Sequence, residues 1–111
     1  MKHNFPSYEI VASDISILVG KKLFVRFAFS IAGDDEFHLQ EDCFVIKHVA
    51  HDCGEKEIFI QQKVASFEVG EESYTLGFRI SEKKGLQFWY SEGEDNSDKK
   101  LDEGKTEIKL I

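Results

Sequence analysis

Residues 22–31 read KLFVRFAFSI, a segment in which apolar side chains recur at every second position. The apolar positions that share one face are Leu23, Val25, Phe27, Phe29 and Ile31. Because successive side chains of a strand point to opposite faces, this period of two predicts a strand with one buried face. No stretch of ten or more residues shows convincing helical periodicity, so the sequence favours an all-β fold.

Residues 74–90 repeat the pattern as a predicted hairpin. Residues 74–80 (YTLGFRI) and 86–90 (LQFWY) alternate in the same way, and the SEKKG segment between them suits a loop with glycine at a left-handed position. If residue 80 faces residue 86, Gly77 lies opposite Trp89 on the outer side, where the indole is expected to cover the glycine.

Shorter segments supply the remaining predicted strands. They are residues 8–12, 15–19, 37–40, 43–50, 57–64 and 106–110. We expect a bulge or bend at residues 41–42 and a hairpin that pairs 43–50 with 57–64. Residues 92–104 carry no periodic apolar signal and predict a long, mobile acidic loop. The expected architecture is a single domain over residues 1–111, an antiparallel β-sandwich or small barrel of about seven to eight strands.

The charge of the chain limits its possible partners. It has 14 Lys and Arg against 21 Asp and Glu, a net charge of −7. That sign opposes binding to a phosphate backbone, so we expect no nucleic-acid partner. With neither a signal-like apolar run at residues 1–6 nor a membrane-spanning stretch, we expect a cytoplasmic protein without a membrane partner, in which Cys43 and Cys53 stay reduced.

No catalytic or cofactor motif occurs in the sequence, so we predict neither an enzyme nor a bound cofactor. The densest group of possible metal ligands is Cys43, His48, His51 and Cys53. Their C-x4-H-x2-H-x-C spacing lacks the knuckles of common zinc sites, and strand alternation sends Cys43 and His48 to opposite faces. We therefore predict no metal site, with Cys43 as an apolar filler and His48 near the core.

Two acidic clusters, residues 34–36 and 94–98, resemble loops that hold calcium when they converge. Surface acidity that favours solubility is the commoner cause of such runs. We expect them to bind no metal.

Size and charge favour a non-enzymatic protein-binding domain that docks a basic partner, for example a toxin-neutralising immunity or inhibitor protein. The predicted partner-binding residues are Asp34, Asp35, Glu36, Glu41, Asp42, Asp52, Glu55, Arg79 and Trp89. One alternative is a structural or assembly subunit that forms a homo-oligomer. Another is a small-molecule or enzymatic site at the strand ends.

Overall fold

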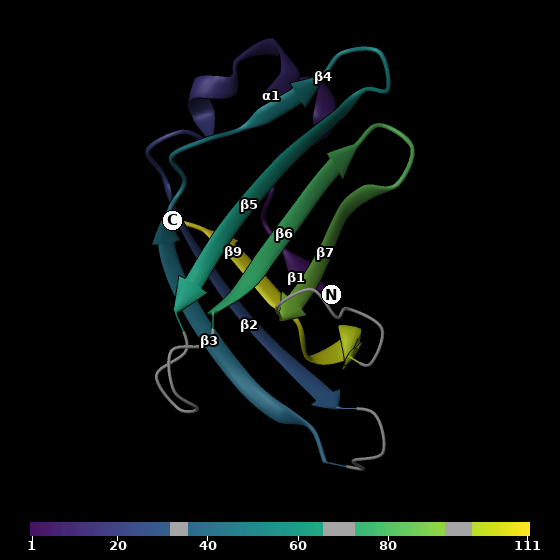
Figure 1. Cartoon of the computed structure of the whole chain (residues 1–111). Helices are drawn as coiled ribbons and strands as arrows, with labels where there is room; N and C mark the ends of the chain where they lie inside the picture. The colour runs from purple at the N-terminus through teal and green to yellow at the C-terminus, as the bar shows by residue number, and fades with distance from the viewer. Residues whose placement is uncertain (32–35, 66–72, 93–98) are drawn as a thin grey trace.

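Two β-sheets face each other in the computed structural model, which describes residues 1–31, 36–65, 73–92 and 99–111 (Figure 1). Sheet A contains, in spatial order, β1 (Lys2–His3), β9 (Glu107–Leu110), β2 (Lys22–Ile31) and β3 (His38–Val45), and β8 (Lys99–Leu101) also pairs with β2. Sheet B contains β4 (Ala50–Asp52), β5 (Glu57–Ala65), β6 (Ser73–Ser81) and β7 (Gly85–Glu92) in that order. The predicted all-β sandwich is confirmed, with one departure from antiparallel order, because β1 runs parallel to β9.

The core lies between the sheets and is rich in aromatic rings. Leu23, Val25 and Phe27 of β2 are fully buried, as the period of two predicts. The Phe27 ring centroid lies 5.3 Å from those of both Phe88 and Tyr90 on β7, so sheet A contacts sheet B directly. Aromatic pairs at such distances stabilise a core beyond the area that they bury.

The predicted hairpin of β6 and β7 is confirmed residue by residue. Ile80 pairs with Leu86, and Gly77 pairs with Trp89. Gly85 has a φ of 67°, the left-handed conformation expected at the end of the loop.

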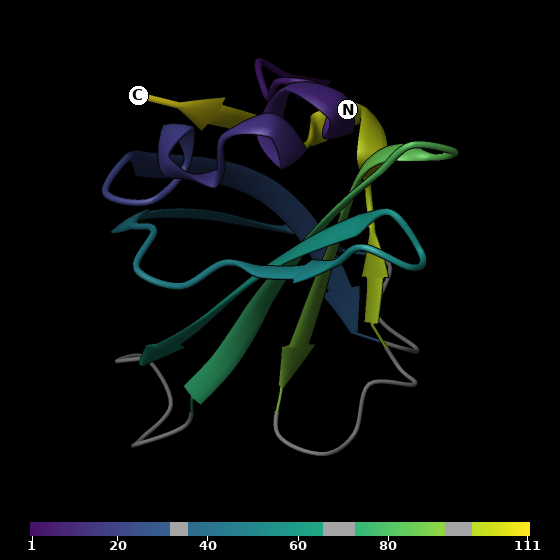
Figure 2. The same ribbon diagram turned by 90° about the horizontal axis from the view of Figure 1, so that it is seen from above.

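The two N-terminal strand predictions are wrong. Residues 8–12 lie in helix α1 (Tyr8–Ser13), and residues 15–19 contain the 3-10 turn η1 (Ile15–Ile17). Val11 and Leu18 are fully buried, and α1 lies across the end of the sandwich that is uppermost in Figure 1 and nearest the viewer in Figure 2. A helix of six residues is too short for its 3.6-residue period to stand out in the sequence.

The prediction for residues 41–50 also needs correction. No bulge occurs at residues 41–42, because Glu41 and Asp42 pair in unbroken register with β2. Residues 43–45 belong to β3, so the predicted hairpin of 43–50 with 57–64 is reduced to the short pairing of β4 with β5. The chain leaves sheet A at Ile46, a buried residue whose N–H donates to the Lys21 carbonyl at 2.9 Å.

Residues 92–104 were predicted to form a loop, but they include β8 and the 3-10 turn η2 (Glu103–Lys105). Residues 93–98 of that segment lie outside the described residues, so its mobility stays a prediction. Strands β8 and β9 pair with different halves of β2, with Leu101 opposite Phe29 and Glu107 opposite Arg26. Five residues (102–106) therefore lie opposite two (27–28), and η2 takes up the excess. No helix in the described part of the chain is long and apolar enough to cross a membrane.

Replacing Phe27 or Phe78 with alanine should lower the free energy of unfolding by about 3–5 kcal/mol, because both rings are fully buried and their removal leaves a cavity. Urea denaturation followed by circular dichroism measures the loss. Phe24→Ala is the matched control, since Phe24 lies on the outer face of β2 and is only partly buried. A smaller loss at Phe27 and Phe78 than at Phe24 would contradict this assignment of the faces.

Candidate functional site: an arginine–aromatic patch on sheet B

Arg79 and Trp89, two of the predicted partner-binding residues, lie together on the outer face of sheet B. The Arg79 guanidinium carbon is 5.8 Å from the centroid of the Trp89 ring and 5.3 Å from that of Phe59 on β5. Gln87 pairs with Arg79 across β6 and β7. We call Phe59, Arg79, Gln87 and Trp89 the arginine–aromatic patch. In Figure 1 the outer face of β5, β6 and β7 points toward the viewer, and no other described element lies across it.

Register and the glycine at position 77 place the Trp89 ring. Because Gly77 lies directly opposite Trp89, the indole can lie flat on the backbone of β6. A methyl group at Gly77 would overlap the indole ring. The close contact predicted between these residues is therefore confirmed, and it holds the ring beside Arg79.

Two polar atoms of the patch are buried without a hydrogen-bond partner. They are Nε of Arg79 and Oε1 of Gln87. Leaving such an atom unpaired costs about 1–3 kcal/mol, whereas each cation–π contact returns about 0.5–1 kcal/mol at an exposed site. The patch therefore keeps unused hydrogen-bonding capacity next to its aromatic rings.

Asp52 and Glu55 are on the same sheet as the patch, at the end where β4 turns into β5. The Asp52 carboxylate caps this turn, since Oδ1 accepts from the N–H groups of Gly54 and Glu55 at 3.1 Å. Glu57 begins β5, two residues before Phe59. Carboxylates thus lie along one end of the face that carries the patch.

Glu36, Glu41 and Asp42 are on the sheet A side and do not join this group. Glu41 is exposed, and its Oε1 lies 3.2 Å from Nε of Arg26, which offsets its charge. Glu36 is exposed just before β3. The structure therefore separates these acidic residues from the patch, and Asp34 and Asp35 lie outside the described residues.

Asp42 points inward, toward sheet B. Its two carboxylate oxygens accept from the Tyr74 hydroxyl at 2.8 and 2.9 Å, and Nε2 of Gln40 donates to the same hydroxyl at 3.0 Å. Burial raises the pKa of the Asp42 carboxyl above its usual range, against the opposing effect of the Tyr74 hydrogen bond. Burial and the Asp42 bond likewise raise the pKa of Tyr74.

The four possible metal ligands do not gather. Cys43 is exposed on β3 and His48 is exposed beyond it, so both predictions of their burial are wrong. His51 lies elsewhere, with Nε2 2.9 Å from the Tyr8 hydroxyl and Nδ1 3.8 Å from Sγ of Cys53. Within the described ranges, no three His, Cys, Asp or Glu side chains are grouped to hold a metal ion.

Comparisons with protein-family models, curated proteins and solved structures find no significant match to this chain. The chemistry of the patch follows from its own side chains. Phe59 and Trp89 offer flat apolar surface, and Arg79 offers hydrogen-bond donors. Flat apolar surface next to hydrogen-bond donors is a combination suited to binding.

Gly77→Ala should destabilise the protein by about 1–3 kcal/mol, because the new methyl group displaces the Trp89 ring. The same substitution in a Trp89→Ala background should be neutral or slightly stabilising, since alanine is less costly than glycine within a strand. Urea denaturation of the four proteins completes a double-mutant cycle. Equal effects of Gly77→Ala in both backgrounds would show that the indole does not rest on Gly77.

Asp42→Asn should gain stability relative to the wild type as the pH rises. The folded-state pKa of Asp42 is raised above the ordinary 3.8, so folding favours the protonated carboxyl and the wild type loses stability between pH 3.8 and the raised pKa. Asparagine carries no such penalty and still accepts from Tyr74. Denaturation midpoints measured across this range check the trend, and Glu41→Gln, which changes the adjacent exposed carboxylate, should show no such gain.

Proposed function

We propose that this chain is a non-enzymatic protein-binding domain whose partner has a basic surface. The observation that carries the proposal is Arg79 next to the rings of both Phe59 and Trp89, on a face of sheet B that no other described element covers. Tryptophan and arginine are the side chains most enriched among residues that dominate binding energy. Their pairing on a fixed β-sheet supplies an anchor that loses little conformational freedom when a partner binds.

The unpaired polar atoms support the same function. Nε of Arg79 and Oε1 of Gln87 are buried within the patch without a hydrogen-bond partner. Burying these groups with their hydrogen bonds made is more favourable than burying them unpaired. A partner that supplies both a donor and an acceptor therefore gains free energy from the patch.

Charge supports a basic partner. The chain carries a net charge of −7, and Asp52, Glu55 and Glu57 lie at one end of the same face. Carboxylates at the rim of an interface speed the approach of a positively charged protein. An inhibitor that neutralises a basic toxin, as an immunity protein does, is one form that a small acidic domain of this kind takes.

Assembly of copies of this chain is a second candidate, because of β3. This strand pairs only with β2 among the described strands and exposes Leu39 and Val45. An edge strand with exposed apolar side chains is a usual place for strands of two chains to pair. Concentration-dependent sedimentation that Leu39→Lys abolishes would support assembly, whereas a monomer at every concentration would exclude it.

Trp89→Ala should weaken partner binding without unfolding the domain. Wild-type, Trp89→Ala and Phe24→Ala proteins would be used as baits to capture and identify basic proteins. Surface plasmon resonance would then measure the binding rates of each purified partner to the three baits. We expect Trp89→Ala to raise the dissociation rate about 30-fold, equivalent to about 2 kcal/mol. Phe24→Ala, which removes a partly buried ring from the opposite sheet, should bind like the wild type.

Reversing Glu55 and Glu57 to Lys should instead slow association and flatten its dependence on salt, because rim charges act mainly on the rate of encounter. The measurement is the association rate of the same partner at several salt concentrations. A partner whose binding neither Trp89→Ala nor the charge reversal alters would contradict the proposal.

A further inference from the structure

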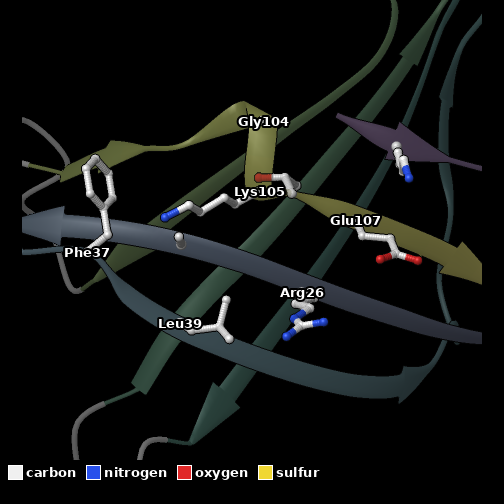
Figure 3. Close-up of a pocket in the computed structure, with 9 residues that line it drawn as sticks. Arg26, Phe37, Leu39, Gly104, Lys105 and Glu107 are labelled. Carbon is white, nitrogen blue, oxygen red and sulfur yellow. The ribbon is translucent and has the colours of Figure 1, made fainter.

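A hollow of about 450 Å³ opens on the outer face of sheet A, beneath η2. Figure 3 shows Leu39 on the β3 side of this hollow and Lys105 extended toward Phe37, with Arg26 and Glu107 nearer the β1 end. Its volume is within the range of small-molecule pockets in proteins. It lies on the opposite sheet from the arginine–aromatic patch.

Local hydrogen bonds fix the turn that forms one wall of the hollow. The Asp102 N–H donates to the Ala28 carbonyl at 3.0 Å, and Oδ1 of Asp102 accepts from the Gly104 N–H at 3.0 Å. Oγ1 of Thr106 donates to the Asp102 carbonyl at 3.0 Å. Because the turn is tied to β2 and to itself, the hollow exists without a ligand to shape it.

Three cations line the hollow together with a single carboxylate. Lys2, Arg26 and Lys105 come from β1, β2 and η2, and Glu107 is the acid. The whole chain has 14 Lys and Arg against 21 Asp and Glu, so the hollow has an excess of positive charge where the chain has an excess of negative charge. The parallel pairing of β1 with β9 brings Lys2 beside Glu107.

The carboxylates near the hollow leave much of this positive charge unpaired. Glu107 pairs with a lysine that does not line the hollow, with its Oε1 2.9 Å from Nζ of Lys109. No carboxylate of a described residue lies within ion-pair distance of Lys2 or Lys105, while Arg26 has its one partner in Glu41. The pKa of Glu107 is lowered mainly by Lys109 and also by Lys2 and Arg26, as expected in a positive field.

The β3 side of the hollow is apolar. Phe37 and Leu39 remain 42% and 55% exposed, and Ala28 beside them adds only a methyl group. Nζ of Lys105 lies 5.9 Å from the Phe37 ring centroid. A ligand that suits this surface has an apolar group next to its charge.

We propose that this hollow binds a small organic anion, in which a carboxylate, sulfonate or phosphate group is attracted by the positive charge of Lys2, Arg26 and Lys105 and an apolar part contacts Phe37 and Leu39. A charge-assisted hydrogen bond to one of these cations holds the anionic group, and the charge of the others adds to the attraction. This site is separate from the proposed protein-binding face, and either can exist without the other.

The probe is 8-anilinonaphthalene-1-sulfonate, which combines a sulfonate with aromatic rings and fluoresces when it leaves water. In titrations that excite the probe itself and record its fluorescence, the wild type should bind one equivalent of probe in a saturable way. Inorganic phosphate should compete with the probe. The double variant Lys2→Gln/Lys105→Gln should bind the probe roughly tenfold more weakly and lose the competition. Circular dichroism confirms that each variant is folded.

The matched control is Lys47→Gln/Lys63→Gln, which removes two exposed charges elsewhere and should bind like the wild type. Trp89→Ala should also bind like the wild type, because it alters only the sheet B face. Equal affinity in the two double lysine variants would overturn the proposal. So would binding that Trp89→Ala abolishes, since the probe would then occupy the arginine–aromatic patch.

Discussion

The contacts of Phe27 with Phe88 and Tyr90 hold the two sheets together, and both outer faces depend on them. Phe27 can point inward only if Arg26 and Ala28 point outward, which places these two residues at the hollow beneath η2. On sheet B, the inward direction of Phe78 and Phe88 sends Arg79 and Trp89 to the outer face. Since a slip of one residue would reverse every side chain of a strand, the packing of these rings fixes the surfaces as firmly as it fixes the core.

Much of the sandwich could be predicted because its long strands have one apolar face. Strand β2 and the hairpin of β6 and β7 follow the period of two, and the pairing of Gly77 with Trp89 follows from the hairpin loop. The short elements could not be predicted in this way. Helix α1 completes less than two turns, which is too short to show a helical period in the sequence. Strand β8 forms by pairing with β2, which is distant in sequence, so it has no local pattern of its own.

Three of the four residues of the arginine–aromatic patch could be predicted from local pairing, and one could not. Arg79, Gln87 and Trp89 lie within one hairpin, whereas Phe59 reaches Arg79 through the separate pairing of β5 with β6. For the acidic residues the error is the opposite one. Residues that are neighbours in sequence were predicted to share one surface, but their side chains do not lie together. Glu41 and Asp42 are neighbours, yet strand alternation sends one to solvent beside Arg26 and the other to Tyr74.

Trp89 is the only tryptophan in the chain. Its indole rests on the backbone of β6, next to a guanidinium group, so the intrinsic near-ultraviolet emission of the protein comes mainly from one place on one face. The emission maximum and its accessibility to soluble quenchers therefore report on that face and not on the core, whose rings are phenylalanine and tyrosine. The chain thus has a built-in optical reporter on the outer face of sheet B.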